Sequence, residues 1–135
     1  MPTANVLLEV QSGFRTKLTG DSTLMAIITG VFDEAPNIQP YPFISFGEKV
    51  KVPWSTFQKA SWEVAIMLDI WAALDSGDTA MTVLAEVDRI LHYQKLTMTS
   101  YDNALTENEN TVTQEDETNQ VRHVAIRFRT LNSLI

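Results

Sequence analysis

The sequence predicts an α+β fold with a mainly antiparallel sheet and helices packed on one of its faces. Two segments repeat apolar residues at helical spacing, one near the N-terminus and one in the middle of the chain. Two other segments alternate side chains with the period of a strand. The predicted order is helix, strands, helix, strands, which is typical of α+β proteins. A length of 135 residues suits a single domain spanning 1–135.

The first predicted helix runs from about residue 4 to residue 18. Its apolar residues share one side at spacings of three and four: Val6, Leu7, Val10, Phe14 and Leu18. Gly13 costs this helix about 1 kcal/mol relative to alanine, and Gly20 is expected to end it. A second, brief helix, capped by Asp21 or Ser22, is expected to reach Ile28.

The stretch 31–48 is stiffened by three prolines: Pro36, Pro40 and Pro42. Each proline fixes its own φ angle and biases the preceding residue toward extended backbone. We interpret the stretch as a rigid connection that delivers either Phe43, or Ile44 and Phe46, to the core. The alternation that follows predicts a strand over 43–48, and the segment 51–56 is predicted to be a loop or a sheet edge.

Residues 60–72 predict the clearest strand. Its apolar face carries Trp62, Val64, Ile66, Leu68 and Ile70. Its second face is mixed and is expected to be partly wet: Glu63, Ala65, Met67, Asp69 and Trp71. The next segment, 76–94, predicts the best helix, with Ser76 or Asp78 as its cap. The buried stripe of this helix is expected to contain Ala80, Val83, Leu84, Val87, Ile90 and Leu91.

The C-terminal third is predicted as a strand, an acidic loop and a closing strand. Residues 95–101 predict the first strand, with Leu96 and Met98 pointing inward. Residues 102–120 are predicted to form a mobile, solvated loop, since they contain six acids and no base: Asp102, Glu107, Glu109, Glu115, Asp116 and Glu117. The closing strand, 121–131, alternates Val124, Ile126 and Phe128 with Ala125, Arg127 and Arg129.

Composition excludes several classes of protein. The formal net charge of −7 argues against tight wrapping by DNA, because phosphates are neutralised by clustered lysine and arginine. The absence of cysteine excludes disulfides, thiolate catalysis and cysteine-based metal sites. No apolar run approaches the ~18 residues that span a bilayer, so no membrane partner is expected. The N-terminus has no basic region before an apolar run, and no secretion signal is predicted.

No catalytic, metal-binding or cofactor-binding residues are predicted, and the chain is not expected to be an enzyme. His92 and His123 are interpreted as surface or interface side chains. The acidic segment lacks the central glycine and the oxygen spacing of a calcium loop. Asp69 is interpreted as a sheet-face carboxylate paired across strands with Arg127 or Arg129. It stands ~20 Å along the strand from Glu63, which is too far for paired acid–base work.

Surplus apolar surface is the remaining signal. The mixed sheet face offers Met67 and Trp71, and the nearby loop offers Trp54 and Phe57. Large exposed apolar patches usually mark interaction surfaces. These four residues, with Arg127 and Arg129, are the predicted interface residues. A different class, an acidic protein that mimics DNA and inhibits a nuclease, stays open as an alternative, although it requires carboxylates spaced like phosphates.

The succession of segments resembles the small tail-completion or tail-terminator proteins of long-tailed bacteriophages and prophages. The most telling parts are YPFI at 41–44, LDIW at 68–71, and the basic pattern of the closing strand from Arg122 to Arg129. The resemblance covers most of the chain, roughly residues 6–130. It implies an α+β fold in which helices pack on a curved sheet.

The same resemblance implies a structural virion protein. Such proteins cap the tail tube at its head-proximal end as hexameric rings, end tube polymerisation and join the tail to the head connector. The implied partners are other copies of the chain, the tail tube protein, and the connector or stopper protein. The chain would be a hexamer in the assembled tail, whether or not it is a monomer in solution. DNA would only pass through the lumen. The acidic residues Glu107, Glu109, Glu115, Asp116 and Glu117 would then face the lumen or a partner. The protein would be made in the bacterial host cytoplasm. Another neck component, a stopper or adaptor, is the related alternative.

Overall fold

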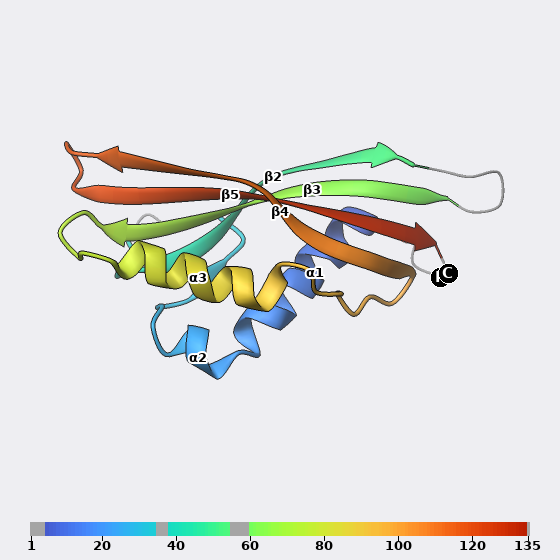
Figure 1. Cartoon of the computed structure of the whole chain (residues 1–135), viewed down its shortest axis with the longest axis horizontal. Helices are drawn as coiled ribbons and strands as arrows, with labels where there is room; N and C mark the ends of the chain where they lie inside the picture. Colours follow the sequence, from blue (N-terminus) through green and yellow to red (C-terminus); the bar gives the residue numbers. More distant parts are fainter. Residues whose placement is uncertain (1–4, 35–37, 55–59, 135) are drawn as a thin grey trace.

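A computed structural model of the chain describes residues 5–34, 38–54 and 60–134. Within these ranges the chain forms three helices and a five-stranded sheet. The helices lie together on one side of a long, twisted sheet, and no helix of the described residues lies on its other side (Figure 1). The predicted α+β class is confirmed. No helix in the described ranges is long and apolar enough to cross a membrane.

The helices follow the predicted apolar stripes. Helix α1 spans Val6–Thr19, and the side chain of Asn5 caps it by accepting a hydrogen bond from Leu8 N at 3.1 Å. Helix α2, Ser22–Met25, is capped by Asp21 and ends earlier than the predicted Ile28. Helix α3 spans Thr79–Leu91. Asp78 occupies the position before it without a side-chain cap hydrogen bond.

Gly13 does not interrupt α1, although glycine is unfavourable inside a helix. It is buried, and a Cβ atom there would lie 3.2 Å from Leu96 Cβ. The loop after α3 therefore passes close to α1 at this position. Close packing of the Leu96 side chain against the helix backbone explains a glycine that local propensity would disfavour.

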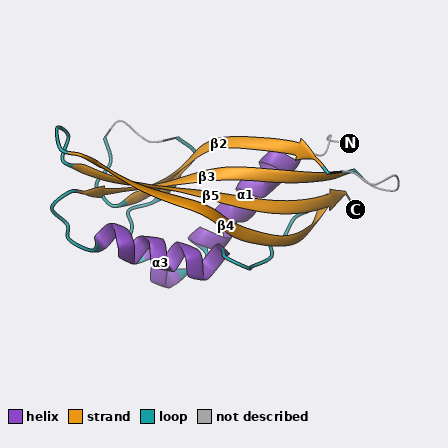
Figure 2. Cartoon of the chain, turned by 45° about the horizontal axis from the view of Figure 1, so that its top comes forward, coloured by secondary structure: helices purple, strands orange, loops and turns teal. Residues whose placement is uncertain are grey.

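The sheet has the order β1-β2-β3-β5-β4. Its strands are β1, Val31–Phe32; β2, Phe43–Pro53; β3, Ser61–Ala73; β4, Tyr101–Asp116; and β5, Val121–Leu134. The short β1 runs parallel to β2, and the other neighbours are antiparallel. Figure 2 shows β2 and β4 along opposite sides of the sheet. Strand β2 continues past the predicted 43–48 to Pro53. The first part of the segment 51–56 is therefore a sheet edge, one of its two predicted forms.

The predicted acidic loop over 102–120 is wrong. Residues up to Asp116 belong to β4, and only 117–120 form a turn. From Glu109 onward every residue of β4 is exposed, so both of its faces are wet. Such an edge strand has no apolar alternation for sequence reasoning to detect. Glutamate and asparagine, which are depleted in strands, further masked it.

The predicted strand over 95–101 is also wrong for all but its last residue. Residues 95–98 are irregular, and only Tyr101 belongs to β4. Leu96 does point inward and is buried. Its backbone N–H donates to the side chain of Asn103 at 3.0 Å, so a side chain, not a neighbouring strand, satisfies it.

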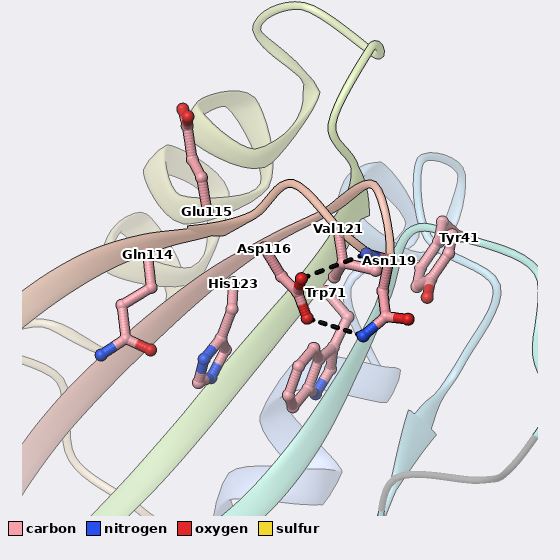
Figure 3. A pocket seen from close by; sticks show the side chains of 8 residues that line it. All are labelled: Tyr41, Trp71, Gln114, Glu115, Asp116, Asn119, Val121 and His123. Carbon is pink, nitrogen blue, oxygen red and sulfur yellow. Dashed lines mark hydrogen bonds between the residues drawn. The ribbon is translucent and has the colours of Figure 1, made fainter.

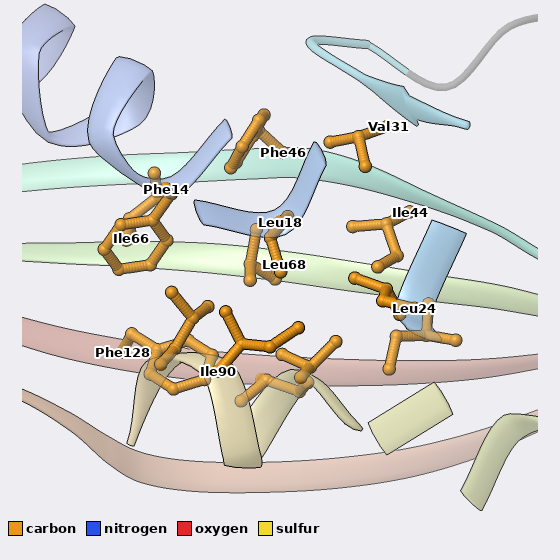
Figure 4. Packing of buried hydrophobic residues seen from close by; sticks show 14 of the residues in the cluster. Phe14, Leu18, Leu24, Val31, Ile44, Phe46, Ile66, Leu68, Ile90 and Phe128 are labelled. Atoms are coloured by element: carbon orange, nitrogen blue, oxygen red, sulfur yellow. The ribbon is translucent and has the colours of Figure 1, made fainter. Parts of the chain in front are cut away.

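One cluster of buried residues joins the helices to the sheet (Figure 4). At its centre the rings of Phe14 and Phe128 meet edge to face with centroids 5.6 Å apart. Both side chains are fully buried. The apolar face of β3 predicted from sequence lies in this cluster, except that Trp62 is only partly buried. The predicted stripe of α3 lies there too, with Leu84 partly buried.

A polar network lies inside this core near the start of β4. Asn103 Nδ2 donates to Asn132 Oδ1 at 2.8 Å, and Asn132 Nδ2 donates to Thr130 Oγ1 at 2.7 Å. All three residues are buried. Because buried amides are costly unless bonded, this network fixes how the start of β4 sits against β5.

Two ion pairs tie the helices to the rest of the chain. Arg15 of α1 bonds the carboxylate of Asp33 at 2.7 Å and the carbonyl of Val31 at 3.1 Å. Arg89 of α3 bonds Asp21, the cap of α2, at 2.8 Å. Hydrogen bonds from Arg15 and Gln11 lower the pKa of Asp33, and the Arg89 guanidinium lowers the pKa of Asp21.

Candidate assembly surface

The face of the sheet turned away from the helices is the candidate functional surface, here called the open face. Along each strand, side chains point alternately into the core and onto this face. On its two central strands it carries Glu63, Ala65, Met67, Asp69, Trp71, His123, Ala125, Arg127 and Arg129. Beside these lie Phe43, Ser45 and Gly47 of β2, and Glu107, Val112 and Gln114 of β4. The prediction that the second face of β3 is only partly wet is confirmed, since most of its side chains are half-buried.

Four rings stand side by side across one end of the open face. Tyr41 stacks on Phe43 at 5.7 Å, Phe43 on Trp71 at 6.3 Å, and Trp71 on His123 at 4.1 Å, measured between ring centroids. The strand register produces this ring row, because Trp71 lies directly opposite both Phe43 and His123. Trp71 also donates from Nε1 to Ser45 Oγ at 2.9 Å. The row is therefore fixed by both stacking and hydrogen bonding.

Asp69 lies beside the ring row and pairs with His123. Its Oδ1 is 2.6 Å from His123 Nε2, and both side chains are mostly covered. The predicted pairing of Asp69 with Arg127 or Arg129 is wrong. Asp69 lies opposite Ala125, so His123 and Arg127 are its two diagonal neighbours on β5. Arg127 instead bonds Glu109 of β4 on its other side.

The other half of the open face carries a ladder of charges. Arg129 bonds Glu63 of β3 at 3.3 Å and approaches Glu107 of β4 at 4.0 Å. Arg127 bonds Glu109 at 3.3 Å. Arg129 therefore sits between carboxylates of both flanking strands, whereas Arg127 meets one on β4 alone. Exposed pairs of this kind contribute little to stability, but they fix the pattern of charge that a partner meets.

A cavity of about 600 Å³ opens where the ring row meets the β4–β5 turn. Figure 3 shows Trp71 and His123 beside Asp116 and Asn119, with Tyr41 on the far side. Asn119 bonds the carboxylate of Asp116 through its side-chain amide at 2.8 Å and its backbone N–H at 3.1 Å. These hydrogen bonds lower the pKa of Asp116, the side-chain bond most. The cavity thus combines ring edges with an ionised carboxylate.

The predicted interface residues are distributed unevenly. Met67, Trp71, Arg127 and Arg129 lie on the open face. Trp54 follows β2 at the opposite end of the sheet from the ring row and is 54% exposed. Phe57 lies outside the described residues. The missed members of the surface are Tyr41 and Phe43. Their stacking, and that of His123, which was expected at the surface or an interface, depends on a cross-strand register that the sequence does not reveal.

The acidic residues also divide between surfaces. Glu107 and Glu109 bond arginines on the open face. Glu115 bonds Arg122 at 3.0 Å, opposite it on β5. Asp116 lines the cavity, and Glu117 begins the turn. These five carboxylates therefore follow an extended strand and its turn.

The second histidine, His92, is not among the residues that line the cavity. His92 ends α3, and its Nδ1 accepts a hydrogen bond from Asn108 N at 2.9 Å. It thus holds the edge of β4. Within the described ranges, no three histidine, aspartate or glutamate side chains gather as a metal site would require. The geometry of the open face suits contacts between proteins.

Residues 14–133 match the family model described as tail completion protein gp17. The chain belongs to this family. The match spans most of the strands and helices described above, so the resemblance inferred from sequence is confirmed. The tail completion family is a structural component of phage virions and not a family of enzymes. A structural role in tail completion follows for this member.

Two solved structures share the fold of this tail completion protein. One is a chain in the virion of a native gene transfer agent particle, with a TM-score of 0.87 and 18% identity over 97% of this chain and 99% of that chain. The other is the gp17 protein of bacteriophage SPP1, with a TM-score of 0.59 and 18% identity over 89% and 86%. A comparison with curated protein sequences finds no match.

Proposed function

We propose that this tail completion protein caps the tail tube at its head-proximal end as a closed ring, most simply a hexamer. The ring ends tube polymerisation and offers a surface to the head connector or stopper protein. The protein is then a virion component at the head-proximal end of the tail, made in the cytoplasm of the bacterial host. Family membership supports the tail-completion role.

The observation that carries the proposal is the uncovered open face. A sheet with helices on one side leaves its second side to water or to partners. Here that side carries Trp71 and Met67 beside the charge ladder. Mixed surfaces with an aromatic centre and a charged border are typical of interfaces between proteins. We therefore assign the open face to contacts made in the assembled tail.

Carboxylates suit a ring through which DNA passes. Glu107, Glu109 and Asp116 lie at the outer strand of the sheet, near or on the open face. Phosphates that pass within a Debye length of these groups, ~8–10 Å, are repelled. A duplex would then slide without adhering to the ring wall. DNA is accordingly a passing occupant of the lumen and not a bound ligand.

The test compares the same substitution at two methionines, one on the open face of the sheet and one on helix α3. Met67→Arg places a charge at the centre of the open face, whereas Met81→Arg does so on the outer side of α3, where the side chain is 39% exposed. We expect Met67→Arg to give unjoined heads with uncapped or over-long tails by electron microscopy. Met81→Arg should give normal particles. Deletion of the whole protein sets the reference phenotype.

The proposal fails if deletion leaves normal, infectious particles, or if the protein is missing from purified tails. A stopper or adaptor role would instead give tails of normal length that do not join heads. Tail length therefore separates the capping role from the related alternative.

A further inference from the structure

The two outer strands of the sheet are left unpaired over complementary stretches. Strand β4 is last in the sheet order, and its start is covered by the loop after α3, where Thr106 exchanges backbone hydrogen bonds with Tyr93 and Gln94. Among the described residues, nothing pairs with the outer backbone of 109–116. At the other side, β1 covers β2 only at Ile44 and Ser45. The outer edge of 46–53 is likewise free within the described ranges.

The charges on the two free stretches are opposite. The β4 stretch carries Glu109, Glu115 and Asp116 and no base. The β2 stretch carries Lys49 and Lys51 with one acid, Glu48. Like charges facing each other across paired strands are destabilising, and opposite charges are favourable. Two β4 edges or two β2 edges therefore repel, whereas a β4 edge and a β2 edge attract.

Strand directions fit the same pairing. The pairs β2–β3, β3–β5 and β5–β4 are all antiparallel, so β4 runs opposite to β2. If copies are related by rotation about an axis roughly along the strands, β4 of one copy meets β2 of the next in antiparallel orientation. This is the slightly more stable arrangement per residue. It also continues the alternation already present in the sheet.

The stretches are offset along the strands. The free part of β4 ends at Asp116, which lies level with Ala73 at the C-terminal end of β3. Strand β2 ends at Pro53, which lies opposite Trp62 near the N-terminal end of β3. The β4–β5 turn and the end of β2 accordingly lie at opposite ends of the long axis (Figure 1). Successive copies must therefore be staggered. Strands of a closed barrel are tilted to its axis and staggered in this way.

We propose that copies of this chain join edge to edge, with residues 109–116 of β4 pairing against residues 46–53 of β2 in the neighbouring copy. The inference rests on the proposed ring and names its joint. A contact between two different edges is heterologous, and it closes when the rotation is right. The sheets then form one continuous wall, which leaves no free edge. Contacts between copies then do not require the open face.

Cysteine cross-linking tests this joint, since the chain contains no cysteine of its own. Val112 lies near the middle of the β4 stretch, and Val50 and Val52 lie in the β2 stretch. All three side chains are at least partly exposed on the open face. The two edges of one chain are on opposite sides of the sheet, so a disulfide between them must join two copies. The matched control pairs Val112→Cys with Met81→Cys on α3.

Purified tails carrying Val112→Cys with Val50→Cys or Val52→Cys should give a ladder of cross-linked species on oxidation. The control pair should give none. Cross-linking of Val112→Cys alone would reveal β4 facing β4 and would overturn the inference. Tails that contain the protein but give no ladder with either pair would also overturn it, while leaving the proposed function intact. Absence of the protein from tails would remove the proposed function and this joint together.

A charge exchange gives a second, independent test. Lys49→Glu with Lys51→Glu makes both edges acidic, whereas Glu115→Lys with Asp116→Lys leaves Glu109 as the single acid of the β4 stretch and gives both edges a net positive charge. Each double variant alone should lose capping. A mixture of the two should restore it, because the variants can alternate around an even-numbered ring. Capping by either double variant alone at the wild-type level would contradict edge pairing.

Discussion

Gly47 of β2 lies so close to Asp69 of β3 that a Cβ atom at position 47 would stand 2.8 Å from Asp69 Oδ2. It would also lie 3.2 Å from Met67 Cβ. The side chain of Asp69 can reach His123 only because the neighbouring strand offers no side chain here. A glycine in a strand often marks such a close approach. This one keeps the carboxylate in line with the ring row.

Gly47→Ala should therefore displace Asp69 and weaken its bond to His123. We expect a loss of about 1–2 kcal/mol in the free energy of unfolding, as overpacking typically gives. Urea titration followed by tryptophan fluorescence measures it. In an Asp69→Ala background the same glycine change should cost less, since the clashing oxygens are absent. Equal costs in both backgrounds would show that the contact with Asp69 is not the cause.

Phe128→Ala should be among the most destabilising substitutions in the chain. The side chain is fully buried and its ring meets Phe14 edge to face. Removing a buried phenylalanine costs about 3–5 kcal/mol through lost transfer energy and the cavity left behind. Thermal unfolding by calorimetry checks this value. Met81→Ala, at an exposed site on α3, should stay within about 0.5 kcal/mol of wild type.

Asn103→Ala should destabilise the chain although it removes a polar side chain. The change leaves Leu96 N and Asn132 Oδ1 without their hydrogen bonds in a buried setting. Each buried unsatisfied group costs about 1–3 kcal/mol. Hydrogen exchange should quicken at the Leu96 amide. Asn110→Ala, at an exposed position of β4, should alter neither stability nor this amide, and an unchanged Leu96 rate in Asn103→Ala would argue against the network.

The tie between α1 and β1 should weaken in acid. Arg15 and Gln11 lower the pKa of Asp33 from its ordinary 3.8, so the folded state favours the charged form. The resulting stabilisation is complete above the ordinary pKa and is lost as pH falls through the lowered one. Because both partners are well exposed, it amounts to less than about 1 kcal/mol.

Asp33→Asn should accordingly be less stable than wild type at pH 7, and the difference should shrink as pH falls below 3.8. Denaturant titrations at a series of pH values measure the two curves. Arg15→Met should remove the same pH-dependent part, since it takes away the main partner. Curves that stay parallel down to low pH would show that this ion pair does not contribute.

Much of the fold could be predicted because its central elements have one dry side. Helices α1 and α3 and strands β3 and β5 each pack an apolar face into the core, so the period of their apolar residues reveals both type and extent. Strand β1 escaped prediction because two residues carry no period. Strand β4 escaped because its outer half has no dry side.

The site was only partly predictable, since it depends on register. Alternation placed Met67 and Trp71 on the open face, but not the neighbours they meet there. His123 and Arg127 are both diagonal neighbours of Asp69. Arg127 already bonds Glu109 of β4, so Asp69 bonds His123. Because the sequence does not reveal β4, it gives no sign that Glu109 lies beside Arg127 and competes with Asp69 for it. One missed strand thus produced the wrong ion pair two strands away.

The exposed tip formed by residues 117–120 offers a practical site for labels. No residue from 109 to 120 is buried, and lengthening a flexible loop costs only about 0.6 kcal/mol for each doubling. An epitope or fluorescent peptide inserted between Thr118 and Asn119 should therefore leave the core folded. Such a reporter would let the orientation of the chain in a particle be read directly by gold labelling.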